Sequence, residues 1–186
     1  MPTPTTNNLG RSAAVGAGVG VIASIVMAMY AMFASLAKDH GFFTPLYHIA
    51  SLWISPSHLM MSMQNGMMHH NFTFAFGPAV LGAILHMMTG AMYGAVFGVI
   101  ASRLNLGLGA LAGLGLVYGF IVFVISSYIG LPIAGAIFSS GDQIKNMAKM
   151  AGWGTFIVEH LLFGITLGSM IAMAKARMAP ASTPAH

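Results

Sequence analysis

The sequence predicts an all-α protein, a polytopic membrane bundle of four helices, on the strength of its composition and four long apolar stretches. Of the 186 residues, 57% are hydrophobic and only 5% are charged, whereas about 25% are charged in soluble domains. Seven basic and three acidic side chains cannot cover the surface of a water-soluble fold. The basic residues are scattered along the chain, so no nucleic-acid partner is expected. We expect a single transmembrane domain, residues 1–186, surrounded by the lipid bilayer.

Four stretches are long enough to cross a hydrocarbon layer, which needs about 20 apolar residues. These predicted spans cover residues 12–37, 76–102, 107–131 and 153–174. The connection between the first two spans, residues 38–75, is rich in Met and His. The connection between the third and fourth spans, residues 132–152, is also long, and a short turn at residues 103–106 joins the second and third spans.

The distribution of basic residues predicts the orientation of the spans. One end of the bundle would carry basic residues and no acid, namely Arg11, Arg103, Lys175 and Arg177. The other end would mix both signs of charge, from Lys38, Lys145, Lys149, Asp39 and Asp142. The positive-inside rule therefore places both termini in the cytoplasm, the spans in the cell (inner) membrane and residues 38–75 outside.

Both outer connections carry the pattern of a short interfacial helix. Thr44 followed by Pro45 is typical of a helix start. Tyr47 and Trp53 suit the headgroup layer of a membrane. In the second connection, Ser139 precedes Asp142 by three residues, as in a capping box. One apolar face follows at helical spacing, formed by Ile144, Met147, Ala148 and Ala151.

The pattern of the spans predicts an internal repeat, and the alternative is chance matching among the 23 glycines of the chain. At an offset of 74 residues, the second span aligns with the fourth, so that His86, Gly90, Gly94 and Arg103 fall on His160, Gly164, Gly168 and Arg177. At an offset of 95, residues 18–20 of the first span (Gly-Val-Gly) fall on residues 113–115 of the third. Two tandem helical hairpins in a parallel repeat are predicted. The glycines recur in GxxxG spacing, which favours close packing of helices in lipid.

Three ionisable residues lie well inside apolar runs, namely His86, Glu159 and His160. Such groups are costly in lipid and mark a functional or strongly packed interior position. Each His precedes its terminal Arg by 17 residues, which places both in the outer half of the bundle. They are candidate ligands for a b-type haem or a metal, with Glu159 as an orienting partner. The alternative is a buried hydrogen-bond network that fixes the helix register.

Thioether and imidazole side chains gather in the first outer connection, and both suit Cu(I). The candidate copper ligands there are His58, Met60, Met61, Met63, Met67, Met68, His69 and His70. Met88 and Met92 continue the pattern in the second span. The alternative is that methionine serves as a flexible apolar filler, because the chain contains 17 Met.

These Met clusters, followed by the MxxxM pair of Met88 and Met92 and a GxxxG, resemble the Ctr copper transporters, whose pore is lined by methionine. The resemblance implies copper handling by the Met-rich segments. The chain departs from that family because it has four predicted spans rather than three and lacks the C-terminal Cys/His motif. Its layout, with Phe-Gly-Pro at the start of the second span and Leu-Pro at the end of the third, also resembles small four-span bacterial membrane proteins. That second likeness implies the topology and no activity.

The chain contains no GxSxG, HExxH, Walker or nucleotide-binding glycine motif, so we expect no enzyme. The expected function is a non-catalytic accessory subunit that packs against other membrane subunits through its glycine faces and Met-rich segment. A Cu(I)-binding or copper-transport protein is the first alternative. A membrane anchor that binds haem b between His86 and His160 is the second.

Overall fold

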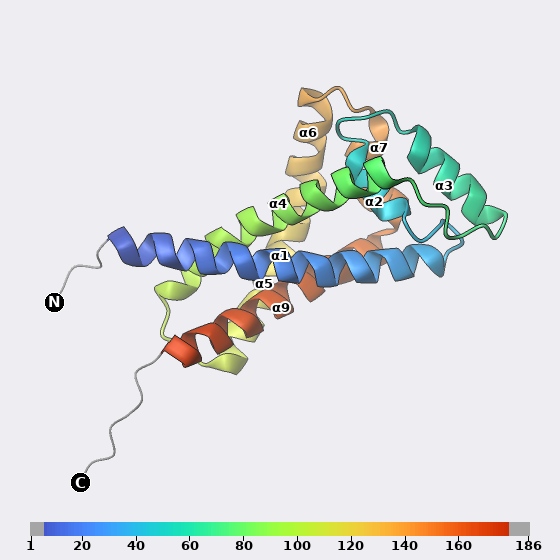
Figure 1. Ribbon diagram of the computed structural model, residues 1–186. Helices are drawn as coiled ribbons and strands as arrows, with labels where there is room; N and C mark the ends of the chain where they lie inside the picture. The colour runs from blue at the N-terminus through green and yellow to red at the C-terminus, as the bar shows by residue number, and fades with distance from the viewer. Residues whose placement is uncertain (1–5, 179–186) are drawn as a thin grey trace, which may run out of the picture.

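The computed structural model describes residues 6–178 and confirms an all-helical bundle with four apolar helices long enough to cross a membrane (Figure 1). The long helices are α1 (Thr6–Leu36), α4 (Phe76–Ser102), α9 (Trp153–Met178) and a composite third span. The third span begins with α5 (Leu108–Ile125) and continues through a π-helical segment, η1 (Ser126–Gly130), into α6 (Leu131–Ile137). The predicted second span matches α4 at both ends.

The third span is longer than predicted, because the helix passes Leu131 and Pro132 and ends at Ile137. A proline inside a helix normally breaks the hydrogen-bond ladder. Here it stands at the start of α6, directly after the wide turn of η1, whose end is closed by the Leu131 N–H on the Ser126 carbonyl. The π segment therefore lets the span continue past the proline, which the sequence pattern did not reveal.

The four spans form two hairpins, α1 with α4 and α5 with α9, and α1 also packs against α9 (Figure 1). Glycines let each pair approach backbone to backbone. A Cβ at Gly20 would lie 2.9 Å from the Cα of Gly94, and a Cβ at Gly115 would lie 3.0 Å from the Cα of Gly168. The two contacts are related by the offsets of 95 and 74 residues, so the closest contacts of the two hairpins obey the sequence repeat.

The same relation holds one turn further along. Gly90 faces Ser24 in the first hairpin, and Gly164 faces Gly119 in the second. By contrast, a Cβ at Gly18 or at Gly113 would meet nothing within 4 Å, although both glycines are part of the repeat in the sequence. The glycines that matter for packing are therefore those on the facing surfaces of each hairpin.

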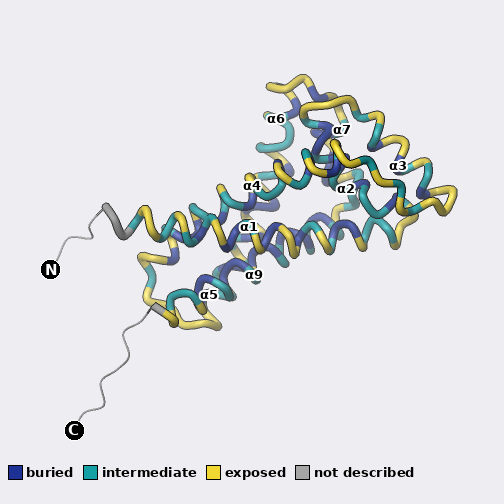
Figure 2. The backbone as a smooth tube through the Cα atoms, viewed as in Figure 1, coloured by how far each residue is buried: buried dark blue, intermediate teal, exposed yellow. Residues whose placement is uncertain are grey.

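Large apolar side chains cover the outside of the spans, as expected for a bundle in lipid. Figure 2 shows exposed residues along the outer faces of the long helices and buried ones between them. The main buried cluster includes Phe97, Leu111 and Leu167. These residues fill the bundle toward the end where α1 begins and α9 ends, which we call the terminal end.

The other end, which we call the connection end, is built from four short helices. They are α2 (Thr44–Ala50), α3 (Ser57–Met67), α7 (Asp142–Lys145) and α8 (Met147–Ala151). The helices predicted in both outer connections are therefore present. The predicted face of the second connection is also present, since Ile144, Met147 and Ala148 are buried.

The predicted helix starts are wrong in detail. The N-cap of α2 is Phe43, and the Thr44 hydroxyl instead bonds the His40 carbonyl and the Ser62 hydroxyl. Ser139 does not cap α7, whose N-cap is Gly141 with a φ of 81°. The predicted cap hydroxyl of α2 makes other contacts, and the N-cap of α7 is a glycine. A local sequence pattern cannot show either outcome.

Tyr47 is also not in the headgroup layer as predicted. Only 2% of its surface is exposed, because α2 packs onto α4, with the Leu46 backbone in contact with Gly82. The buried Tyr47 hydroxyl accepts a hydrogen bond from the Ala75 N–H at 2.7 Å and donates one to the Thr73 carbonyl at 3.1 Å. Burial raises the pKa of Tyr47, while the hydrogen bond from Ala75 opposes the shift. α2 is therefore a buried roof over the bundle rather than a surface helix.

Candidate functional site

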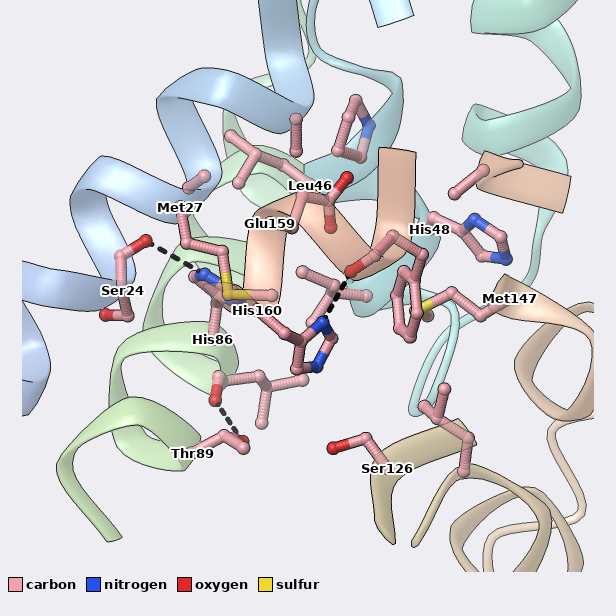
Figure 3. A pocket seen from close by; sticks show the side chains of 18 of the residues that line it. Ser24, Met27, Leu46, His48, His86, Thr89, Ser126, Met147, Glu159 and His160 are labelled. Carbon is pink, nitrogen blue, oxygen red and sulfur yellow. Dashed lines mark hydrogen bonds between the residues drawn. The ribbon is translucent and has the colours of Figure 1, made fainter. Parts of the chain in front are cut away.

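A cavity of about 420 Å³ lies between the two hairpins in the half of the bundle nearest the connection end (Figure 3). Its walls come from all four spans, and its roof comes from α2, α7 and α8. Most of the lining is apolar, for example Met27, Leu85 and Phe163. Pockets that bind small molecules have about this size, a mostly apolar lining and a few convergent polar groups.

Some of the residues that line the cavity are also exposed or half-buried at the surface. At the connection end its lining includes Lys38, which is exposed, and the half-buried His40. On the side of the bundle its lining includes Thr89 and Met92 of α4, which are also exposed.

His86 projects from α4 into the cavity wall beside α1. Its Nε2 lies 3.0 Å from the Ser24 carbonyl oxygen (Figure 3). A carbonyl only accepts hydrogen bonds, so Nε2 carries the proton and donates it. In a neutral ring the Nδ1 atom then keeps its lone pair.

His160 projects from α9 and is only 4% exposed. Its Nδ1 lies 2.7 Å from the carbonyl oxygen of Phe156, one turn earlier in the same helix. Nδ1 is therefore the donor, and the lone pair of the neutral ring is on Nε2. The two imidazoles line one cavity.

Glu159 lines the same cavity and is 6% exposed. Neighbouring residues on a helix point about 100° apart, and Figure 3 shows the Glu159 carboxyl and the His160 ring in different parts of the cavity. The group that orients His160 is the Phe156 carbonyl rather than the predicted Glu159. Within residues 6–178 the Glu159 carboxyl has no side-chain hydrogen-bond partner, which leaves its oxygens available to a ligand.

Lys38 ties the rim of the cavity together. Its ammonium donates to the Ala151 carbonyl at 2.6 Å and to the Thr155 hydroxyl. Thr155 precedes Glu159 by one helical turn, so the ammonium stands at the same rim as this carboxyl. The clamp joins the end of α1 to the start of α9 across the connection end.

His48 belongs to the roof and is 6% exposed. Its Nε2 donates to the Gln143 carbonyl at 2.9 Å, which joins α2 to α7. Burial lowers the pKa of His48, and the hydrogen bond to Gln143 opposes that shift. The roof is therefore held by a neutral imidazole.

The predicted copper ligands of the first outer connection are not gathered in one buried place. α3 packs through Leu59, Ser62 and Gly66, and its methionines other than Met63 point outward. The exposed methionines are Met60 (60%), Met61 (42%), Met67 (66%) and Met68 (53%), and Met88 in α4 is 61% exposed. Met63 and Met92 line the cavity.

His58, His69 and His70, the predicted copper-binding histidines of that connection, are also apart from the cavity. The Nδ1 of His69 lies 3.7 Å from the carboxylate of Asp39 at the surface. His70 is exposed, and the His58 ring lies against Tyr47, with ring centroids 6.3 Å apart. Among the described residues no three His, Asp or Glu side chains form a metal-binding group.

Sequence reasoning found His86, His160 and Glu159 but missed four other residues of the site. Met27 was one of many methionines, and Lys38 and His48 looked like ordinary polar residues of a loop. Ser126 lies in the π segment beside the cavity. The only local signal for such residues is a polar side chain at the edge of an apolar run. This signal does not show which residues converge on the cavity.

No family model, curated protein or solved structure matches the chain.

Proposed function

We propose that the protein is a non-catalytic binding subunit of the cell membrane that holds a small ligand in the cavity between its two hairpins. The observation that carries the proposal is the combination of a largely apolar cavity of about 420 Å³ with Glu159, His86 and His160 at its wall. Ionisable side chains in a membrane interior are costly, so their convergence on one cavity favours a function there.

The donor geometry supports binding rather than catalysis. Within the described chain, each imidazole bonds a backbone carbonyl, and neither bonds a hydroxyl or the Glu159 carboxyl. Nucleophilic catalysis needs a nucleophile in hydrogen-bond contact with its base. The ring nitrogen of His86 that keeps its lone pair is Nδ1, the nitrogen nearer to the backbone. A compact ligand reaches that atom more easily than a haem does.

Contact with other membrane subunits is part of the proposal. Large apolar side chains are exposed at the connection end outside the spans, including Met60, Met67 (66%), Phe72 (65%) and Phe74 (55%). Exposed apolar patches of this kind mark contacts with a partner or with lipid. Methionine adapts its shape to such a partner at little cost.

The proposed orientation places the terminal end in the cytoplasm and the cavity toward the outside. Arg11, Arg103 and Lys175 line one hollow at the terminal end, and the positive-inside rule favours the cytoplasm for such an end. Lys175 also donates to the carbonyls of Ala101 and Leu104 and so holds the end of α4.

A pair of neighbouring alanines in α6 tests whether the cavity holds a ligand. Ala134 lines the cavity, whereas Ala136 is exposed on the outer face of the same helix. The proteins with Ala134→Phe and with Ala136→Phe would be purified from their own membranes beside the unchanged protein. Organic extracts and metal contents of all three would then be compared by mass spectrometry.

We expect one species to be retained near one per chain by the unchanged protein and by Ala136→Phe. The Ala134→Phe protein should lose it, because a phenyl ring would fill the cavity. Identical contents in all three proteins would contradict the proposed function.

A further inference from the structure

The two neutral imidazoles of the cavity are each held with one ring nitrogen free to donate a lone pair. The Ser24 carbonyl fixes the proton of His86 on Nε2, and the Phe156 carbonyl fixes that of His160 on Nδ1. The remaining nitrogens, Nδ1 of His86 and Nε2 of His160, therefore carry lone pairs. Metal-binding histidines are held in this manner, with the second ring nitrogen donating to a carbonyl or carboxylate.

A thioether stands beside these two rings. Met27 follows Ser24 by three residues on α1, so both lie on the same face of that helix. Long side chains on a helix lean toward its N-terminus, which brings the Met27 sulfur over the contact between Ser24 and His86. Figure 3 shows Met27 and His86 in the same part of the cavity.

Met27 is also close to the helix that carries His160. It is 8% exposed and packs in one buried cluster with Phe163, which lies one turn beyond His160 on α9. Met27, His86 and His160 thus converge from α1, α4 and α9 on one cavity.

The charge of the cavity favours a monovalent ion. Both imidazoles are neutral donors, and the thioether carries no charge. The lining holds one acidic residue, Glu159, and one Lys, Lys38, so it has no excess of negative charge. A divalent ion would therefore leave more charge uncompensated in this apolar environment than a monovalent ion would.

We propose that the sulfur of Met27, the Nδ1 of His86 and the Nε2 of His160 bind a Cu(I) ion. Thioether and imidazole donors suit this soft, monovalent ion, and hard ions such as Mg²⁺ and Ca²⁺ prefer oxygen. The inference rests on the proposed function for the place of the ligand and adds its chemical class. It moves the copper site from the exposed residues 58–70 to the interior of the bundle.

The test measures Cu(I) affinity of the full chain in detergent, without oxygen, by competition with the chromogenic chelator bicinchoninate. The unchanged protein should bind one Cu(I) per chain. Met27→Leu keeps the apolar volume and removes only the sulfur, so it should weaken Cu(I) binding by at least about tenfold while thermal unfolding is unchanged. His160→Gln should weaken it as much or more.

Two controls separate this site from other methionines. Met29→Leu changes a methionine on the lipid-facing side of α1, 39% exposed, and should leave the affinity unchanged. Replacing Met60, Met61, Met67 and Met68, which lie outside the cavity lining, together by Leu should also leave it unchanged. Loss of Cu(I) in that fourfold variant would overturn the inference, and so would equal affinity of Met27→Leu, His160→Gln and the unchanged protein.

The outcome for copper is distinguishable from the outcome for the cavity. If the Ala134→Phe protein loses a co-purifying organic molecule but no variant affects Cu(I), the cavity binds a ligand and the copper inference is wrong. If Cu(I) binding depends on Met27 while all organic extracts are identical, the metal site stands and the cavity has no organic guest.

Discussion

Single side chains of the connection end act mainly by closing the roof of the cavity. His48 and Lys38 each join two elements that are far apart in the chain, α2 to α7 and the end of α1 to α8 and α9. Both use the side chain to satisfy a backbone carbonyl that a short helix or turn leaves without a partner. The roof is therefore held by polar contacts, and its stability should depend on conditions that alter them.

Acid should weaken the roof through His48. Burial lowers the pKa of His48 in the folded protein, so the unfolded chain, with a pKa near 6.5, binds the proton first. The stabilisation is fully present above about pH 6.5 and is lost as the pH falls through that value toward the folded pKa, by at most about 1.4 kcal/mol per pH unit.

Thermal unfolding in detergent between about pH 7.5 and 5.5 measures this effect. The decrease in stability on acidification should be smaller in His48→Gln, whose amide keeps a donor and does not titrate. An equal decrease in both proteins would show that other histidines cause the acid response.

The sequence revealed part of the site at this scale and not the rest. An ionisable residue inside an apolar run stands out, so His86, Glu159 and His160 could be found. Met27 could not, because its role depends on which face of α1 meets α4, and 17 methionines give no local contrast. The tautomers also depend on Ser24 and Phe156 carbonyls, which no side-chain pattern shows.

At the level of elements, the fold depends on four helices joined in glycine-lined pairs. Gly20 and Gly94 bring α1 and α4 together, and Gly115 and Gly168 bring α5 and α9 together. The repeat of glycines in the sequence predicted this pairing, because GxxxG spacing places small residues on one helix face. The sequence predicted where the roof helices lie along the chain. It did not predict the burial of α2, because that burial follows from the contact of α2 with Gly82 of α4.

Gly20→Ala should destabilise the first hairpin. Its new methyl group would meet backbone atoms of Gly90 and Gly94, which cannot move aside as a side chain can. The expected loss in free energy of unfolding is about 1–3 kcal/mol. Unfolding in detergent, titrated with a denaturing surfactant, measures this loss.

Gly18 provides the matched control on the same helix. Nothing lies within 4 Å of a Cβ at this position, so Gly18→Ala should be neutral or stabilise the helix by up to about 1 kcal/mol. If both substitutions have the same effect, helix propensity rather than close packing explains the glycines.

For the molecule as a whole, the two hairpins pack around an apolar cluster toward the terminal end and enclose a cavity at the connection end. Among the described residues, the cluster around Phe97, Leu111 and Leu167 contains no Asp, Glu, His, Lys or Arg. This asymmetry supports binding from one side rather than passage through the bundle. Our central proposal is therefore that water-soluble reagents reach the cavity from the outside and do not reach the lipid-facing surface next to it.

Two adjacent residues of the third span test this claim most directly. Ser126 lines the cavity, and Ile125 is 37% exposed and does not. The chain has no cysteine, so Ser126→Cys and Ile125→Cys each carry a single thiol. A small, charged, membrane-impermeant methanethiosulfonate added to intact cells should modify Ser126→Cys and leave Ile125→Cys unmodified, because a thiol in hydrocarbon stays protonated and meets no charged reagent. Equal modification of the two proteins, or modification of Ser126→Cys only after the cells are permeabilised, would contradict the account.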